Sequence, residues 1–166
     1  SLITKVYFPR LVIPLSATAA GVVDFAIASV MLLGMMAYYH IVPTSAVWML
    51  PLLVLLAIAT AFGVGLWLSA LNVQYRDVGH ALPFLTQMWL FATPIVYPSS
   101  LIPEQWLALY GLNPMAGVVE GFRWALLGTG SKPGLMLMAS ALTAFAVLVS
   151  GLYYFRRMEQ TFADAV

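Results

Sequence analysis

The segment Ser69–Tyr97, SALNVQYRDVGHALPFLTQMWLFATPIVY, contains the chain's sharpest change from apolar to polar sequence. A long apolar run ends at Leu71, nine residues rich in polar side chains follow, and a second apolar run begins at Ala81. Arginine and aspartate each cost roughly 2.5–3.5 kcal/mol at the centre of a bilayer. Arg76 and Asp77 therefore belong at a membrane surface. If that surface is cytoplasmic, the positive-inside rule orients both flanking runs.

The composition identifies an integral membrane protein. Hydrophobic residues make up 63% of the chain and charged residues 8%, whereas a soluble domain carries about 25% charged residues. The chain has no cysteine, which excludes disulfides, zinc–thiolate clusters and thiol nucleophiles. No basic run suggests a nucleic-acid partner. The sequence begins at Ser1 without a cleavable signal, and we expect a fragment whose amino-terminal part is missing.

Four apolar runs predict an all-α polytopic membrane protein. The expected transmembrane helices cover residues 11–39, 47–71, 81–97 and 135–155. The third is at the lower length limit for crossing, and Pro83 and Pro94 are expected to bend or unwind its ends. Arg156 and Arg157 are expected to end the fourth, leaving a short polar tail. This topology puts the two chain ends and the Arg76 loop on the cytoplasmic side, where most lysines and arginines then lie.

Two short helices are expected between the third and fourth spans. Proline and glycine punctuate residues 98–133, and the pattern predicts helices at Pro103–Tyr110 and Met115–Leu127, the second with Asn113 as N-cap and Pro114 at its first position. Neither is long enough to cross a membrane. We therefore expect two re-entrant helices, at 103–127, that dip in and return on the same side.

The second of these helices carries two further patterns. Glu120 and Arg123 are spaced i, i+3 and are expected to form an ion pair. Gly117 and Gly121 form a GxxxG face that permits close helix packing.

Three other features have two interpretations each. Ser1–Arg10 is amphipathic and could be a short interfacial helix or a frayed chain end. Asp24, in the middle of the first span, is a candidate functional carboxylate. The alternative, a carboxyl group satisfied by neighbouring helices or a wet cavity, is favoured because no basic residue shares its depth. Phe84, Gln87 and Phe91 share one helix face, which could line a path or pack in the bundle.

Catalytic and nucleotide-binding patterns are weak. Gly128–Lys132 lacks the GxxxxGK[ST] spacing of a phosphate loop and is expected to be a turn. In the expected topology the two histidines lie on opposite sides of the membrane and the carboxylates are scattered, which disfavours acid–base or triad chemistry. These observations argue against a membrane enzyme and for a conduit that binds no ATP itself.

Three blocks resemble a known family: KVYFPRLVIPLSA (Lys5–Ala17), LSALNVQYRDVGHALPFLTQMWLFATPIVYP (Leu68–Pro98) and LNPMAGVVEGFRWALLG (Leu112–Gly128). They resemble the membrane subunit of ABC-2 type exporters, in particular the branch that exports lipid-linked polysaccharides such as O-antigen, capsule or teichoic acid. The resemblance covers nearly all of the chain, as a single ABC-2 transmembrane domain. It includes only the last four of the family's six spans and the cytoplasmic segment before them.

The resemblance implies a homodimer in the bacterial cytoplasmic membrane. It also implies two separate ATPase subunits that bind the ATP, so that this chain needs no cofactor, with membrane lipid and a lipid-linked glycan as further partners. The implied ATPase-coupling residues, in segment 1–10 and the Arg76 loop, are Lys5, Tyr7, Phe8, Arg10, Tyr75, Arg76 and Asp77. The implied path-lining residues are Phe84, Gln87, Phe91 and Tyr97. The implied outer-gate residues are Trp106, Asn113, Glu120 and Arg123.

The sequence therefore leaves three candidate functions. The leading hypothesis is the permease subunit of an ATP-driven exporter of lipid-linked polysaccharide. The first alternative is an ABC-2 exporter of drugs or other small lipophiles, and the second is a membrane-embedded lipid-sugar transferase. A transferase would need a carboxylate or histidine cluster on one face, which the sequence does not offer.

Overall fold

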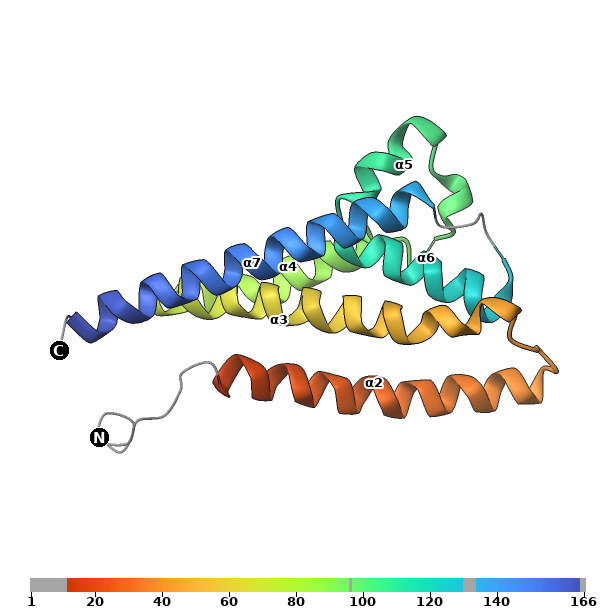
Figure 1. Ribbon diagram of the computed structural model, residues 1–166, viewed down its shortest axis with the longest axis horizontal. Coiled ribbons are helices and arrows are strands. Elements are labelled where there is room, and N and C mark those ends of the chain that lie inside the picture. The colour runs from red at the N-terminus through yellow and green to blue at the C-terminus, as the bar shows by residue number, and fades with distance from the viewer. Residues whose placement is uncertain (1–11, 96, 130–133, 165–166) are drawn as a thin grey trace.

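The computed structural model describes residues 12–95, 97–129 and 134–164 (Figure 1). The predicted coupling residues Lys5, Tyr7, Phe8 and Arg10 lie outside these ranges. Within them, all regular elements are helices, as the sequence predicted. The α-helices are α2 (Val12–Tyr38), α3 (Leu50–Gln74), α4 (Val78–Ala92), α5 (Glu104–Gly111), α6 (Pro114–Leu127) and α7 (Leu135–Asp164). Short 3-10 helices lie at Ser45–Met49 and Ser99–Leu101.

Three helical segments of the described chain are long and apolar enough to cross a membrane: α2, α3 with the 3-10 turn before it, and α7. The predicted third crossing, at residues 81–97, is not among them. The helix there, α4, has 15 residues and rises about 22 Å, against about 30 Å of hydrocarbon. It ends early because Thr93 precedes Pro94, and a residue before proline is driven out of the helical region. Thr93 is extended, with φ −92° and ψ 135°.

Two helices run further than the sequence predicted. The polar segment between the second and third apolar runs was expected to be a nine-residue loop, but only Tyr75–Asp77 separates α3 from α4. Likewise, α7 continues past Arg156 and Arg157 to Asp164, where a polar tail was expected. Both differences have one cause. Charged and amide side chains mark where a membrane ends, but they are compatible with a helix and do not stop it.

The core is built where α7 packs on α3, with α6 against both. A Cβ added at Gly63 would lie 2.9 Å from the backbone of Leu148, and one at Gly151 would lie 2.7 Å from the carbonyl oxygen of Gly63. The two backbones can approach this closely only because both positions are glycine. Further along, the Trp67 and Tyr154 rings stack with centroids 4.6 Å apart.

Helices α5 and α6 form a hairpin against α7. Asn113 caps α6 as predicted, accepting a hydrogen bond from the Met115 N–H at 3.1 Å, with Pro114 at the first helical position. The predicted close-packing glycines are confirmed. A Cβ at Gly117 would lie 2.6 Å from Ser140 Oγ on α7, and one at Gly121 would lie 2.7 Å from the Leu53 side chain on α3.

The connections gather at two opposite ends of the molecule (Figure 1). The α3–α4 turn, the start of α2 and the end of α7 lie at one end. The α5–α6 hairpin and the α2–α3 connection lie at the other. Here Thr44 Oγ1 donates a hydrogen bond of 2.8 Å to the Ala125 carbonyl oxygen, which ties the α2–α3 connection to the last turn of α6. Arg76, Arg156 and Arg157 therefore belong to elements that meet at one end, and Arg123 to the opposite one.

Candidate functional site

The turn between α3 and α4, Tyr75–Asp77, contains the three predicted coupling residues that the structure describes. All three are exposed. The turn is short and ordered by the backbone: the Val78 N–H donates to the Tyr75 carbonyl oxygen at 3.2 Å. Nearby, Tyr154 Oη donates to Gln74 Oε1 at 2.9 Å, so the end of α3 is held to α7. We call this segment the coupling turn. It combines the exposed ring of Tyr75 with the opposite charges of Arg76 and Asp77, beside an end of α3 that is held to α7.

The face of α4 brings three predicted path-lining residues together. Phe84, Gln87 and Phe91 line a shallow cavity of about 280 Å³, with Met88 as its fourth wall. Phe84 is 66% exposed and Phe91 56% exposed, and none of the residues of α4 is buried. The cavity presents two aromatic faces around one amide, a combination that suits a ligand with both apolar and hydrogen-bonding surfaces.

Beyond the end of α4 lies a larger hollow, the aromatic cavity. Its volume is about 400 Å³, and it is lined by Tyr97, Leu101, Ile102, Pro103, Trp106 and Tyr110. The hydroxyl oxygens of Tyr97 and Tyr110 are 3.4 Å apart, and Tyr97 Oη also donates to the Phe91 carbonyl oxygen at 3.0 Å. Pockets of about 300–1,000 Å³ are typical of small-molecule sites. Of the predicted site residues, Tyr97 and Trp106 meet here.

Asn113 connects the hairpin to α4. Its Oδ1 accepts from Trp89 Nε1 at 2.9 Å, and its Nδ2 donates to Thr93 Oγ1 at 2.8 Å. The same Oδ1 caps α6 through Met115, as described above. The carbonyl oxygen of Asn113 is 3.1 Å from Ser140 Oγ on α7. One side chain thus joins the end of α4, the start of α6 and, through its backbone, α7.

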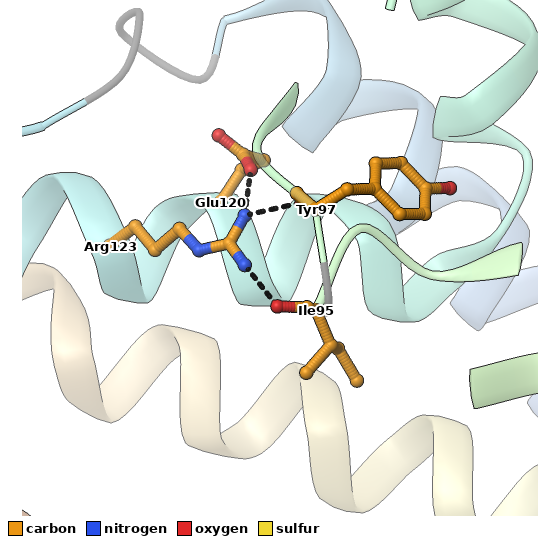
Figure 2. Close-up of polar contacts among 4 residues, drawn as sticks. All are labelled: Ile95, Tyr97, Glu120 and Arg123. Carbon is orange, nitrogen blue, oxygen red and sulfur yellow. Dashed lines mark hydrogen bonds and ion pairs between the residues drawn. The ribbon is translucent and has the colours of Figure 1, made fainter. Parts of the chain in front are cut away.

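Arg123 holds the extended segment that follows α4 (Figure 2). Its guanidinium donates to the Ile95 carbonyl oxygen at 2.8 Å and to the Tyr97 carbonyl oxygen at 3.5 Å. The predicted ion pair with Glu120 is confirmed at 2.9 Å. The Glu120 side chain is only 5% exposed and that of Arg123 26% exposed. In such surroundings a charged pair is maintained only with good geometry and further hydrogen bonds, which the two carbonyl groups supply. The pair and its two carbonyl partners, together with the Asn113 contacts, form what we call the polar latch.

Sequence reasoning missed half of the polar latch. It singled out Asn113, Glu120 and Arg123 on the hairpin, but not Trp89 and Thr93, the partners of Asn113. A tryptophan and a threonine in an apolar run gave no sign that they would meet an asparagine some twenty residues later. The signal that was present is the Thr93-Pro94 pair, because proline ends a helix and frees backbone carbonyls that then need donors.

Asp24 does not join any of these groups. It is exposed on α2, and its neighbour Phe25 makes an edge-on ring contact with Phe122 of α6, with centroids 5.8 Å apart. In the described part of the chain, no group of three His, Cys, Asp or Glu side chains could hold a metal ion.

Comparison with known families identifies the architecture. The family model described as "ABC-2 type transporter" matches residues 3–127 of the 166. The chain belongs to the ABC-2 type transporter family. As a member of that family with several long apolar helices, it is a multi-pass membrane protein. The coupling turn, α4 and the whole α5–α6 hairpin lie within the matched range.

Two curated relatives align with almost the whole chain, and a third aligns with part of it. It is 28% identical to the O-antigen export system permease protein RfbA of Myxococcus xanthus, over 99% of this chain and 64% of the relative. It is 29% identical to the protein of the same name from Klebsiella pneumoniae, over 98% of this chain and 63% of the relative. The polysialic acid transport protein KpsM of Escherichia coli is 29% identical over 63% of this chain and 41% of its own length. The chain thus spans less than two thirds of these relatives.

Proposed function

We propose that this ABC-2 chain is part of the permease subunit of an ATP-driven exporter that moves a lipid-linked polysaccharide across the bacterial cytoplasmic membrane. The observation that carries the proposal is similarity over 98–99% of the chain to two permeases named for O-antigen export. The activity belongs to the longer protein, because this chain spans 63–64% of those relatives.

The chemistry of the two cavities favours a glycan as cargo. Sugar rings have apolar C–H faces that stack on aromatic rings and hydroxyl edges that need hydrogen-bond partners. The aromatic cavity offers Trp106 and two tyrosine hydroxyls, and the α4 face offers two phenylalanines beside Gln87. A purely lipophilic drug would gain nothing from these polar groups. This is the argument against the first alternative, a drug exporter.

The proposed assembly has two copies of the permease around a central path and two ATPase subunits on the cytoplasmic side, which bind the nucleotide. In it the coupling turn and the carboxyl-terminal end of α7 face the cytoplasm. The positive-inside rule supports this orientation, because Arg76, Arg156 and Arg157 belong to elements that meet at one end. The α5–α6 hairpin then lies at the outer surface as a re-entrant gate. The second alternative, a lipid-sugar transferase, lacks support because no group of three carboxylate or histidine side chains gathers among the described residues.

The function is tested with the full-length subunit, expressed with its ATPase partner in cells that lack their own exporter. We expect the partner to co-purify, and export of surface polysaccharide to depend on both chains. Arg76→Glu should reduce export at least tenfold while membrane insertion stays normal, because it reverses the charge that a partner would contact. Thr129→Ala, an exposed change at the opposite end, serves as control. Drug efflux without polysaccharide export would instead support the first alternative.

The re-entrant hairpin is tested by labelling, since the chain has no native cysteine. Single cysteines at Ser100 and Thr129 flank the hairpin, and both should react with an impermeant thiol reagent outside intact cells. A cysteine at Gly79, beside the coupling turn, should react only after permeabilisation. Labelling of Ser100→Cys from outside but of Thr129→Cys only from inside would refute the return of the chain to the same side.

A further inference from the structure

Helix α4 is supported differently from the other long helices. None of its residues is buried, and along its length it contacts α3 only sparsely. Burial begins just past its end, where Thr93 is 2% exposed and Pro94 is fully buried. At its other end, three residues separate it from α3. Helix α4 is therefore attached to the rest of the molecule mainly at its two ends.

The outer attachment consists of side-chain hydrogen bonds. Asn113 bonds Trp89 at 2.9 Å and Thr93 at 2.8 Å, and Arg123 bonds the carbonyl oxygen of Ile95 at 2.8 Å. These bonds reach the last turn of α4 and the segment directly after it. Their other ends belong to α6, which packs on α7 and α3. The attachment is specific, because each of these donor and acceptor atoms bonds one partner on the other side of the contact between α4 and the hairpin.

We propose that Asn113 and Arg123 are positioning residues that fix the outer end of α4 to the hairpin, so that a movement starting at the coupling turn is delivered to the aromatic cavity. Helix α4 connects the coupling turn directly to the aromatic cavity, and Tyr97 of that cavity belongs to the segment that Arg123 holds. Without the polar latch, the outer end of α4 would move independently of α6 and the movement would be lost before it reached the gate. The export role rests on the proposed function, whereas the latch itself does not.

The test uses two conservative changes that remove both Asn113 bonds of the latch and leave the Arg123 bonds in place. Trp89→Phe keeps a ring but removes the indole N–H, and Thr93→Val keeps the shape but removes the hydroxyl that accepts from Asn113. The matched control is Trp67→Phe with Thr86→Val. Trp67 makes an equivalent indole bond to Ser150 at 3.0 Å, away from α4, and the Thr86 hydroxyl bonds only within α4.

Two measurements are made on the full-length subunit with its partner. Hydrogen–deuterium exchange at the Thr93 and Ile95 amides should be at least tenfold faster in the latch variant and unchanged in the control. Polysaccharide exported per ATP hydrolysed should fall at least threefold in the latch variant, with the thermal midpoint within a few degrees of the parent. A merely structural role would lower the amount of folded complex but not this ratio.

The outcomes separate the latch from the proposed function. Unchanged amide exchange would overturn the latch, and faster exchange with a parental export-to-ATP ratio would overturn its positioning role. If no ATPase partner binds the subunit, the proposed function fails and the exchange measurement alone decides whether α4 is latched to α6.

Discussion

Two helix contacts in this molecule are made in opposite ways. Helices α3 and α7 meet over much of their length through glycines, and Gly151 is so close to Gly63 that no Cβ would fit between them. Helix α4 meets α6 at one end only, through polar side chains centred on Asn113 and Arg123. In a bilayer neither contact gains from the hydrophobic effect, because lipid is as apolar as leucine. Packing must stabilise the first contact and hydrogen bonds the second.

The difference indicates which parts can move. Two helices whose backbones touch have a single packing arrangement, because they must separate before one can slide along the other. Side-chain hydrogen bonds can exchange partners with small rotations and cost little to rearrange, averaging about 0.6 kcal/mol within membranes. The α3–α7 pair therefore forms the frame, and α4, which the latch holds to the hairpin, forms the part that can move. Four predictions test this division, from the largest effect to the smallest.

Gly63→Leu should remove most of the folded protein. The new side chain would meet the Leu148 backbone within 2.9 Å, and overpacking of this kind costs about 1–3 kcal/mol or more. We expect at least tenfold less monodisperse protein by fluorescence-detected size exclusion. Gly65→Leu on the same helix is the control, because nothing beyond the local backbone of α3 lies within 4 Å of its added Cβ. Equal losses in both variants would mean that α3–α7 is not the frame.

Arg123→Met should lower the free energy of unfolding by about 2 kcal/mol, since hydrogen bonds to charged groups contribute about 1.5–3 kcal/mol. It breaks the ion pair with a side chain that is 5% exposed and removes the donors to two carbonyl oxygens. Glu120→Gln combined with Arg123→Met should recover part of the loss, because a neutral amide costs less to bury than a carboxylate. Denaturant titration of the purified protein measures both. A double variant less stable than Arg123→Met would contradict the pairing.

Ser140→Ala should cost about 1–2 kcal/mol in the same titration. Ser140 is fully buried, accepts from the Gly117 N–H at 3.0 Å and lies 3.0 Å from the Gly111 carbonyl oxygen. Its loss leaves backbone groups without partners, at the usual desolvation penalty. Thr143→Ala is the control, because that hydroxyl bonds only to Ala139 of its own helix. Identical effects would show that the hairpin does not depend on this hydroxyl.

Tyr154→Phe should have the smallest effect, below about 0.5 kcal/mol. It removes one exposed hydrogen bond to Gln74 and leaves the stacked ring on Trp67 in place. The thermal midpoint is expected to stay within about 2 °C. A larger shift would mean that a hydroxyl, and not ring packing, holds the last turn of α3 to α7.

Sequence reasoning succeeded where the cause was local. The Asn113 cap, Pro114 at the helix start and the Glu120–Arg123 spacing depend on neighbours within one turn, and all three are confirmed. Sequence reasoning was wrong about helix ends at which proline, charge and apolar length gave conflicting signals. Proline ended α4 before the apolar run ended, and charges failed to end α7.

The sequence also could not show which helices would meet. The partners of Asn113, namely Trp89 and Thr93, lie 24 and 20 residues away, on α4 and directly after it. Composition carries no information about such a contact, because apolar runs of similar length are interchangeable until their packing is known. The site was therefore predicted as separate residues, and its connection across α4 came only from the structure.

The shortness of α4 has a consequence for how a bilayer fits around it. Its rise of about 22 Å is roughly three quarters of a typical 30 Å hydrocarbon layer, and past Ala92 the chain bonds to Asn113 and Arg123 instead of adding another apolar turn. A bilayer in contact with α4 would have to thin by about 8 Å to match this helix, and hydrophobic mismatch of this kind costs a fraction of a kcal/mol per Å. The membrane beside α4 is therefore expected to be thinner than the membrane beside α2, α3 and α7.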